Sequence, residues 1–341
     1  MAEVYTSVPA KTTPARLRWA KAHPATDPTT SFAGKTVLIT GPNAGLGYEA
    51  ATKFARLGAS KLVFGVRSLE RGKEAKIKIE LDTKCKSDVI ELVQLDMSSY
   101  TSIEKFAKQV SDKYPVIHAA VLNAGVAPPS HKLSKEGWEM SIQVNVISTA
   151  YLAILLLPKL RESGKAIGSP AHLEFVASSG HGDVTPESVT DSQSILKKVN
   201  DPSTFKFTSQ YQISKLLEMW VMKNIADKTS SDEVIVVASC PGLCKSSIGR
   251  DFSFVLRGLD AVFKSFFAQT SEQGSRILVS AVTTQTNAHG GFYALDTVAT
   301  PGELVTSQQG KALSDKCWGE VLDVLRKQNP DVETILNGYQ G

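Results

Sequence analysis

The sequence predicts an α/β fold: one doubly wound domain with a seven-stranded, mostly parallel sheet and helices on both faces. From Gly34 onward, short runs rich in β-branched residues alternate with longer segments of helical periodicity. The runs are almost continuously apolar, which is typical of parallel strands buried on both faces. All seven runs belong to one series without a repeat of fixed short period, so we expect a single domain.

The elements alternate between strand and helix along most of the chain. The expected strands are 35–40, 61–66, 89–95, 116–122, 172–177, 234–239 and, more weakly, 290–295. The expected helices are 45–58, 69–82, 99–113, 134–162, 209–228 and 271–286, with a C-terminal helix around 312–327 docked on the body. Residues 1–33 are rich in Pro, Thr and Ala and lack periodicity. We interpret them as an N-terminal extension that packs loosely or not at all, ahead of the domain at 34–341.

Composition and charge favour a soluble intracellular protein. Apolar residues make up 42% of the chain and charged residues 21%, which is enough for a sizeable core. The net charge of +4 is small and dispersed, which argues against nucleic acid as a partner. The first residues lack the apolar segment of a secretory signal, and the longest apolar run, "TAYLAILLLP", is far shorter than the ~20 residues that cross a bilayer. We expect a cytoplasmic protein with no stable membrane span.

The four cysteines are better suited to a reducing compartment than to a disulfide framework. Cys240 and Cys244 have the spacing of a ligand pair, but no second pair or histidine cluster completes a zinc site. We therefore expect structural thiols and no bound metal.

A glycine cluster separates the first expected strand from the first helix of the domain, in "TVLITGPNAGLGYEAATKFARLGA". Gly41, Gly45 and Gly47 allow a tight turn and a close approach of the backbone to a pyrophosphate. The free N–H groups and the dipole of the helix N-terminus favour that anion. At the first crossover of a parallel sheet, this turn predicts a dinucleotide site.

The spacing of the cluster, G-x-x-x-G-x-G in "TGPNAGLG", resembles the cofactor motif of the short-chain dehydrogenase/reductase family. Further marks of the family follow in order over about residues 34–300: "LDMSS", "LNAG", Asn145, a serine after the fifth strand, "YQISK" and "CPGLCKSS". The resemblance implies a Rossmann domain. "NDPSTF" and the long link from the serine to the tyrosine are similar to the retinol-dehydrogenase-like branch, particularly its fungal members, some of which serve secondary-metabolite pathways.

The residue type at the end of the second strand distinguishes NAD from NADP. A carboxylate there would bond the ribose 2′-hydroxyl, whereas an arginine accommodates a 2′-phosphate. This chain has Val66 and then Arg67 without an acid, so we expect NADP(H), with Ser68 as a second candidate for the phosphate. Arg67 could instead be a solvated loop charge. The resemblance places Asp96 at the adenine edge, although it could equally cap the next helix.

The resemblance extends the cofactor site to residues from four further loops. The full expected set is Gly41, Asn43, Gly45, Leu46, Gly47, Arg67, Asp96, Asn123, Ala124, Gly125, Tyr211, Lys215, Pro241, Gly242 and Ser246. Ser246 stands where the family usually has a threonine on the nicotinamide carboxamide, and it keeps the hydroxyl.

Tyr211 and Lys215 are the strongest catalytic candidates. A phenol with a pKa of ~10 is a poor acid or base at neutral pH unless its phenolate is stabilised. A lysine at i+4 lies one helical turn away and can provide that stabilisation. The resemblance makes Tyr211 the general acid/base, while Lys215 lowers its pKa and bonds the nicotinamide ribose.

A serine hydroxyl and an asparagine complete the set implied by the resemblance. Two serines follow the fifth strand: the usual double-serine pattern favours Ser179, whereas counting from the strand and from His181 favours Ser178, which we prefer. Asn145 lies within a helix, where asparagine is a poor former, and the family uses it to hold a water linked to Lys215. The catalytic set is therefore Asn145, Ser178, Tyr211 and Lys215.

Two segments should lie over the substrate, because ligands of open α/β sheets bind outside the carboxyl ends of the strands. They are residues 179–210 and a phenylalanine-rich segment around 247–270. The second could be a lid over an apolar substrate or the packing of a small helical lobe; a membrane-surface role is a weaker alternative.

These features predict an NADP(H)-dependent oxidoreductase that interconverts a carbonyl and an alcohol on an apolar small molecule. The alternative is a dinucleotide-binding protein without redox turnover. The family makes a homodimer the expected assembly.

Overall fold

A computed structural model describes residues 13–245 and 254–338 of the 341-residue chain. Its sheet has the strand order β3-β2-β1-β4-β5-β6-β7-β8, and all neighbours are parallel except β7 and β8. The strands are β1 (Thr36–Thr40), β2 (Lys61–Val66), β3 (Ile90–Gln94), β4 (Ala119–Leu122), β5 (Ala171–Val176), β6 (Val234–Ser239), β7 (Phe292–Ala294) and β8 (Thr297–Ala299).

The doubly wound α/β prediction is confirmed, with eight strands instead of seven. The additional strand β8 folds back on β7 through a two-residue turn, Leu295 and Asp296, whose φ angles are 54° and 59°. Such a turn normally carries Asn-Gly or Asp-Gly. Because leucine occupies its first position, the sequence contained no hairpin signal here.

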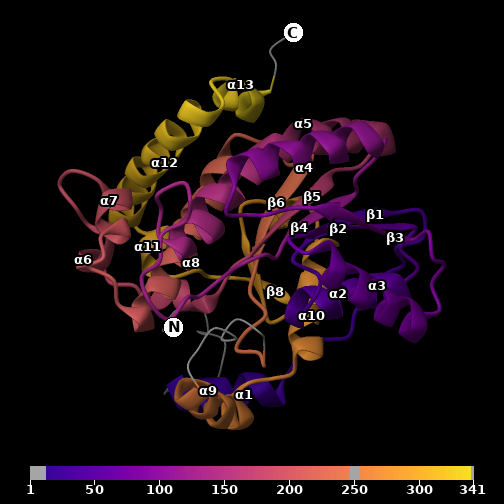
Figure 1. Cartoon of the computed structure of the whole chain (residues 1–341), viewed down its shortest axis with the longest axis horizontal. Helices are drawn as coiled ribbons and strands as arrows, with labels where there is room; N and C mark the ends of the chain where they lie inside the picture. The colour runs from indigo at the N-terminus through magenta and orange to yellow at the C-terminus, as the bar shows by residue number, and fades with distance from the viewer. Residues whose placement is uncertain (1–12, 246–253, 339–341) are drawn as a thin grey trace.

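Helices cover both faces of the sheet (Figure 1). One face carries α4 (Tyr100–Lys113), α5 (Thr149–Ile167) and α8 (Phe207–Asp227), and the other carries α2 (Gly45–Arg56), α3 (Leu69–Thr83) and α10 (Ser271–Ala281). Short helices α6 (Pro186–Val189), α7 (Ile195–Asn200) and α11 (Glu303–Thr306) lie in the connections, with 3₁₀ turns at Ser179–Asp183 and Thr286–Ala288.

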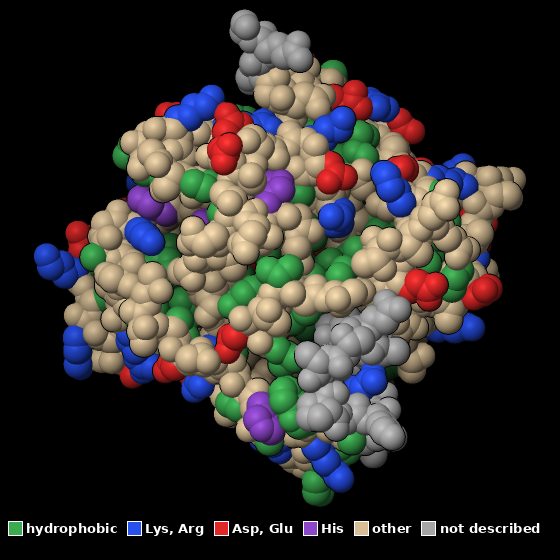
Figure 2. All heavy atoms as spheres, turned by 180° about the vertical axis from the view of Figure 1, so that it is seen from behind, with side chains coloured by type: hydrophobic (Ala, Val, Ile, Leu, Met, Phe, Trp, Pro, Cys, Tyr) green, Lys and Arg blue, Asp and Glu red, His purple; other side chains and the backbone are tan. Residues whose placement is uncertain are grey.

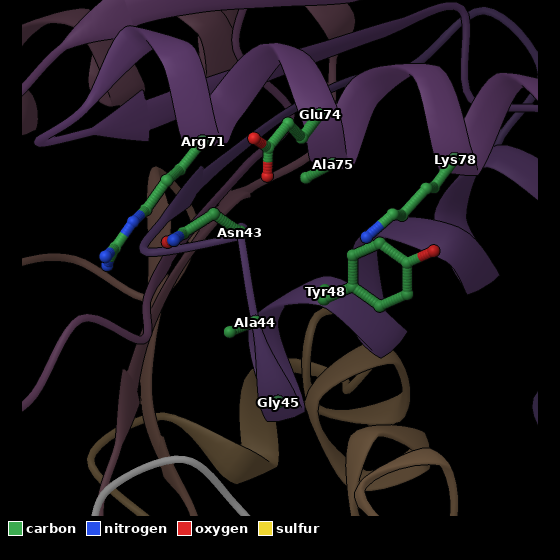
Figure 3. Close-up of a pocket in the computed structure, with 8 residues that line it drawn as sticks. All are labelled: Asn43, Ala44, Gly45, Tyr48, Arg71, Glu74, Ala75 and Lys78. Carbon is green, nitrogen blue, oxygen red and sulfur yellow. The ribbon is translucent and has the colours of Figure 1, made fainter. Parts of the chain in front are cut away.

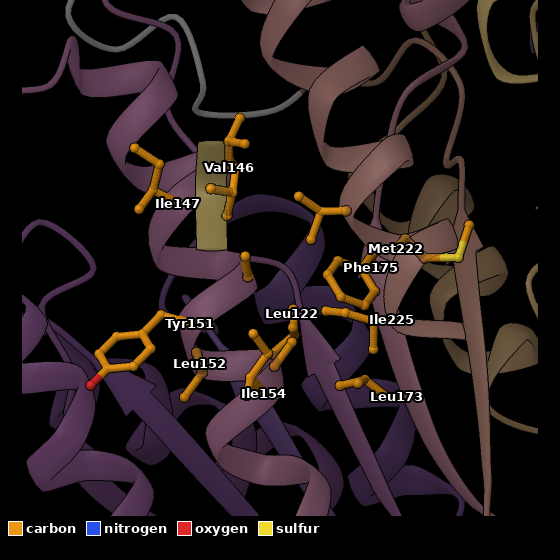
Figure 4. Close-up of a cluster of buried hydrophobic side chains, with 14 of the residues drawn as sticks. Leu122, Val146, Ile147, Tyr151, Leu152, Ile154, Leu173, Phe175, Met222 and Ile225 are labelled. Carbon is orange, nitrogen blue, oxygen red and sulfur yellow. The ribbon is translucent and has the colours of Figure 1, made fainter. Parts of the chain in front are cut away.

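The larger apolar core lies between the sheet and the α5/α8 layer. Leu122, Leu173 and Phe175 of the strands meet Leu152 of α5 and Met222 of α8 there, and all five are 2% exposed or less (Figure 4). Within the described residues, one helix, Ile142–Ile167, is long and apolar enough to cross a membrane, but 89% of its apolar window is buried in the fold. Its apolar character is therefore accounted for by the core.

The helix expected at 134–162 is wrong at its start. Residues Ser134–Trp138 form a turn that needs Gly137 at a φ of 85°, and helical structure begins only at Met140. The carboxylate of Glu139 accepts the N–H groups of Ser141 and Ile142 and so satisfies the first turn. A π-helical stretch, Ile142–Ser148, precedes α5.

The C-terminal helix is confirmed and is longer than expected. It spans Gln308–Gln328 as α12 and packs on α8, where Nδ2 of Asn224 donates to Ser314. The short α13 (Val332–Asn337) then packs on α5, and Arg161 of α5 donates to the carbonyls of Ile335 and Leu336.

The expectation that residues 1–33 pack loosely is wrong for residues 13–33. The chain forms α1 (Thr13–Ala22) and continues to Phe32, whose ring is 1% exposed and packs edge-on against Phe54. Nζ of Lys53 on α2 lies 2.5 Å from a carboxylate oxygen of Asp27 and 2.6 Å from one of Glu272 on α10. These ion pairs attach the segment after α1 to α2 and α10.

α1 lies beside α9 (Phe254–Phe267), and the two helices form a lobe that projects from the body at the bottom of Figure 1. Lys21 donates to the carbonyl of Ser265 at 2.5 Å, and the Arg18 guanidinium lies 5.3 Å from the centre of the Phe267 ring. Hydrophobic and basic side chains share the surface of this lobe, whereas both signs of charge are interspersed over the rest of that face (Figure 2).

Candidate active site

The glycine turn after β1 leaves no room for a side chain at its centre. A Cβ on Gly47 would lie 2.4 Å from Nδ2 of Asn123 and 2.7 Å from the carbonyl oxygen of Gly41. Asn123 is fixed there because its Nδ2 donates to the carbonyl of Thr40 at 2.8 Å. Gly41 and Gly45 have φ angles of 67° and 58°, which favour glycine. The predicted turn therefore has the shape that lets a ligand approach its backbone closely.

The N-terminus of α2 lacks a side-chain cap. Its N-cap residue is Ala44, whereas Ser68, Ser99, Thr270 and Ser307 cap α3, α4, α10 and α12 with their hydroxyls. Free N–H groups at the start of a helix, next to a glycine turn, are a site for phosphate. This chemistry fits the pyrophosphate of a dinucleotide.

A hollow of about 430 Å³ lies between this turn and α3 (Figure 3). It is lined by Asn43, Ala44, Gly45 and Tyr48 from the turn and α2, and by Arg71, Glu74, Ala75 and Lys78 from α3. Arg67, at the end of β2, is exposed, and the hydroxyl of Ser68 accepts the N–H of Arg71 at 3.3 Å. The basic groups at this edge therefore include Arg71 as well as the predicted Arg67.

Asp96 shapes the loop after β3. Its Oδ1 accepts the N–H and the hydroxyl of Ser98, at 2.9 and 2.7 Å, while Ser99 is the residue that caps α4. The alternative that Asp96 caps the next helix is therefore wrong, because its carboxylate bonds Ser98 in the turn before α4 and the cap itself is Ser99.

Asn145 lies in the π-helical stretch and is completely buried. Its Oδ1 accepts the N–H of Val126 at 2.9 Å, and its Nδ2 donates to the Val126 carbonyl at 2.9 Å and to Ser214 at 3.0 Å. The amide thus ties the loop Asn123–Val126 to α8 next to Lys215. Ala124 is fixed from the other side, since its N–H donates to Thr40.

Lys215 is buried beside Tyr211 on α8. Its Nζ lies 5.8 Å from the centre of the Tyr211 ring and donates to the carbonyl of Val176 at 2.8 Å and to Glu218 at 2.6 Å. Because Val176 is the last residue of β5, this places the ammonium at the carboxyl edge of the sheet, where Asn145 and the glycine turn also lie.

Burial and charge oppose one another at this pair. Burial raises the pKa of the Tyr211 phenol, Lys215 lowers it, and Glu218 raises it again, so that the net shift is upward. Burial would lower the pKa of Lys215, but Glu218 and Tyr211 together raise it. The lysine therefore remains an ammonium at neutral pH, which is the form that stabilises a phenolate.

The two serines after β5 differ in their environment. Ser178 is half-buried and its Oγ accepts the N–H of Gly180 at 3.2 Å, whereas Ser179 is 9% exposed and donates its N–H to the sulfur of Cys240 at 3.1 Å. His181 fixes this loop: its Nδ1 lies 2.6 Å from the Ser178 carbonyl, and its Nε2 accepts the N–H of Gly302. Burial lowers the pKa of His181 to about 4, so it remains neutral.

The loop after β6 contains Pro241 and Gly242, the latter with a φ of 71°. Gln269 holds the loop, because its Nε2 donates to the Pro241 carbonyl and its N–H to the carbonyl of Leu243. A Cβ on Gly274 would lie 2.3 Å from the sulfur of Cys244. Ser246 and the start of the expected lid, 247–253, lie outside the described residues.

Comparison with known proteins identifies the family. A family model described as short chain dehydrogenase matches residues 35–169. The chain is 78% identical over 338 residues to short-chain dehydrogenase/reductase phmF of Phaeosphaeria nodorum, covering 99% of this chain and 100% of that protein. It is 66% identical to short-chain dehydrogenase/reductase ffsI of Aspergillus flavipes, with 99% of each covered. The chain belongs to the short-chain dehydrogenase/reductase family.

Solved structures agree with this fold. A short-chain dehydrogenase from Sphingobium yanoikuyae in complex with NADPH is 18% identical, with a TM-score of 0.55 over 76% of this chain and 87% of that one. The 3-ketoacyl-(acyl-carrier-protein) reductase from Brucella melitensis, complexed with NADH, is 20% identical, with a TM-score of 0.56 over 77% and 97%. These structures show the NAD(P)-binding fold, and membership of the short-chain dehydrogenase/reductase family makes this protein an oxidoreductase.

The sequence prediction omitted four residues that shape this site. Arg71 could have been found, because it lies in the first turn of the helix after Arg67. Gln269, Gly274 and Glu218 belong to no sequence motif. Gln269 contacts the loop after β6 from the strand-like segment before α10, and Gly274 contacts the same loop and the glycine turn from α10 itself. Among the described residues, no three His, Cys, Asp or Glu side chains are grouped to hold a metal ion.

Proposed function

We propose that this protein is an NADP(H)-dependent oxidoreductase that interconverts a carbonyl and an alcohol on an apolar small molecule. The observation that carries the proposal is the pair Tyr211 and Lys215, with the buried ammonium held at the end of β5. When bound, the nicotinamide cofactor supplies or accepts the hydride. The protein then has to handle one proton and orient the substrate.

In this mechanism Tyr211 donates its phenolic proton to the developing alkoxide during reduction and takes a proton from the alcohol during oxidation. Lys215 stabilises the phenolate by its charge. The hydroxyl of Ser178 holds the substrate oxygen; its partial exposure and the side-chain hydrogen bond of Ser179 with Cys240 support this choice over Ser179. Asn145 keeps the loop after β4 and α8 in register through its three hydrogen bonds.

We place the expected cofactor residues along the carboxyl edge of the sheet. The glycine turn and the N-terminus of α2 would hold the pyrophosphate, and Arg67 with Arg71 would hold the 2′-phosphate of NADP. Asp96, Asn123, Ala124 and Gly125 would line the adenosine side, and Pro241, Gly242 and Ser246 the nicotinamide side. These roles come from the family resemblance and from the positions of the loops.

Phe263 and Phe266 on α9, exposed by 46% and 61%, support an apolar substrate if α9 acts as its lid. The fungal relatives support a role in secondary metabolism. A homodimer and a cytoplasmic location are further parts of the proposal.

The test combines purified protein, NADPH and a panel of apolar ketones and aldehydes. We expect NADPH oxidation with at least one of them, and a loss of kcat of about 100-fold or more in Tyr211→Phe, because general acid catalysis typically contributes 10²–10⁴-fold. NADPH should still bind to the variant. Turnover that survives the loss of the phenol would overturn the mechanism, and cofactor binding without turnover on any substrate would favour a non-redox protein.

A further inference from the structure

Glu218 lies one helical turn beyond Lys215 on α8 and belongs to none of the roles assigned above. Its Oε2 accepts a hydrogen bond from Nζ of Lys215 at 2.6 Å, and the two side chains are 3% and 5% exposed. The ammonium also donates to the Val176 carbonyl at 2.8 Å. An ammonium has three N–H donors, so these two bonds leave one for the Tyr211 side of the cleft.

Burial couples the two charges. An ion pair in the interior is poorly screened, and removal of one partner leaves an uncompensated buried charge. The lysine ammonium sits on a flexible four-carbon chain, and its electrostatic stabilisation of the Tyr211 phenolate falls with distance. A carboxylate that holds Nζ at the end of β5 therefore determines both where the ammonium lies and how much of its charge is neutralised.

We infer that Glu218 is a positioning residue: it holds the Lys215 ammonium at the end of β5, and its protonation state sets how strongly that ammonium acts on the Tyr211 phenol. The inference rests on the proposed function, in which Tyr211 exchanges the proton. It assigns the pH dependence of the site to a carboxylate outside the expected catalytic set.

The direction of the effect follows from the charges around Tyr211. Burial raises the pKa of Glu218 to about 7, against the lowering effect of Lys215. Below pH 7 the protonated acid leaves the ammonium uncompensated, and above pH 7 the carboxylate raises the pKa of Tyr211. Cys240 and Cys244 face the pair from the loop after β6; burial raises the pKa of both thiols, so they stay neutral near pH 7. β5 contributes the Val176 carbonyl, the loop after it Ser178, and the π-helical stretch Asn145, and none of these groups carries a charge.

The variant Glu218→Gln keeps an oxygen that accepts from Lys215 but cannot ionise. We expect the pH profile of kcat/KM to lose its inflection near pH 7 and its alkaline limb in carbonyl reduction to move about 1 pH unit lower, since a nearby like charge no longer opposes phenolate formation. Glu218→Asp retains a carboxylate and should restore the inflection. A profile in Glu218→Gln that coincides with that of the wild type would overturn the inference.

The matched control is Glu174→Gln. Glu174 is also a completely buried acid, but it lies on β5, accepts the hydroxyl of Ser239 at 2.5 Å, and points to the α10 side of the sheet along with Val176. Its substitution should leave the pH profile unchanged. An equal shift in this control would mean that any buried amide perturbs the profile, which would also overturn the inference.

A titration without substrate separates this inference from the proposed function. The near-ultraviolet absorbance of tyrosinate, taken as the difference between each protein and its Tyr211→Phe counterpart, reports the phenol directly. We expect the Tyr211 phenol to titrate about 1 pH unit lower in the Glu218→Gln background. If the phenol shifts but no carbonyl is ever reduced, the proposed function fails alone. If turnover is present and the two titrations coincide, the role of Glu218 fails alone.

Discussion

Individual side chains at the end of β2 set the charge that a bound dinucleotide would meet. Val66 ends the strand, and the exposed Arg67 follows where an acid would favour NAD. Arg71 reaches the hollow beside Asn43 from the first turn of α3 (Figure 3). Two guanidinium groups, four residues apart at one edge, are suited to a phosphate because each can form charge-assisted hydrogen bonds with it.

We therefore predict that Arg67→Ala and Arg71→Ala each weaken NADPH binding by about 10-fold or more, while NADH binding changes little. The reason is that a charged hydrogen bond contributes roughly 1.5–3 kcal/mol and NADH lacks the phosphate. Fluorescence titration with both cofactors measures this. Arg326→Ala is the control, since Arg326 pairs with Asp323 and Glu333 on the C-terminal helices. Equal wild-type affinities for NADPH and NADH would refute the NADP preference.

At the scale of elements, α10 supports two loops of the expected cofactor site, the glycine turn after β1 and the loop after β6. Gly274 brings its backbone against the loop after β6 and against the glycine turn, because a Cβ there would lie 2.3 Å from the sulfur of Cys244 and 2.9 Å from Cδ2 of Leu46. The end of the leucine side chain can move, whereas Cys244 is held by its bond to the Pro241 carbonyl. The helix α10 thus determines the distance between the glycine turn after β1 and the loop after β6.

Gly274→Ala should overpack this contact. We predict a loss of about 1–3 kcal/mol of unfolding free energy and a weaker affinity for NADPH, as is usual when a methyl group enters a close-packed site. Cys244→Ala in the same chain should restore part of both, because the sulfur is the nearest obstacle, and a double-mutant cycle measures that coupling. Gly319→Ala is the control: a Cβ at this position on α12 would have no neighbour within 4 Å, so the substitution should leave cofactor binding intact. Additive effects of the two substitutions would contradict the proposed contact.

At the scale of the whole molecule, local chemistry was predictable and distant contacts were not. Features that depend on neighbouring residues were predictable: the glycine turn, the Tyr211–Lys215 spacing and the series of apolar strands. Seven strands and most helices were therefore predicted correctly. The helix that leads into α5 was predicted to begin too early, at residue 134. Its true start is marked by the Glu139 carboxylate, which accepts N–H groups of the first turn and leaves no trace in the apolar periodicity. Gln269 and the segment after α1 were missed because their partners lie far away in sequence, as in the pairing of Asp27 with Lys53.

The segment after α1 is attached to the body separately from α1 itself. Phe32 and Ala25 are buried, and Arg276 donates to the Ala25 carbonyl, so residues 25–33 belong to the domain. α1 packs mainly on α9: Lys21 donates to the Ser265 carbonyl and the Arg18 guanidinium lies over the Phe267 ring, while the partly buried Trp19 reaches the larger core. Removal of α1 therefore takes away the Trp19 contact but leaves Phe32 and Ala25 in place, which makes it possible to test whether α9 acts as a lid or as a packing element (Figure 1).

Deletion of residues 1–22 should lower the unfolding free energy by about 1–2 kcal/mol, since α1 contributes the partly buried Trp19 as well as surface contacts. If α9 closes over an apolar substrate, loss of its partner helix should raise KM roughly fivefold, the equivalent of about 1 kcal/mol of apolar contact, with NADPH affinity unchanged. Urea unfolding, steady-state kinetics and cofactor titration measure these three quantities. Phe32→Ala is the contrasting variant and should cost about 3–5 kcal/mol, because it empties a buried site. An unchanged KM in the deletion would assign α9 to packing and not to substrate closure, because the helix would then have lost its support without any effect on the site it was expected to cover.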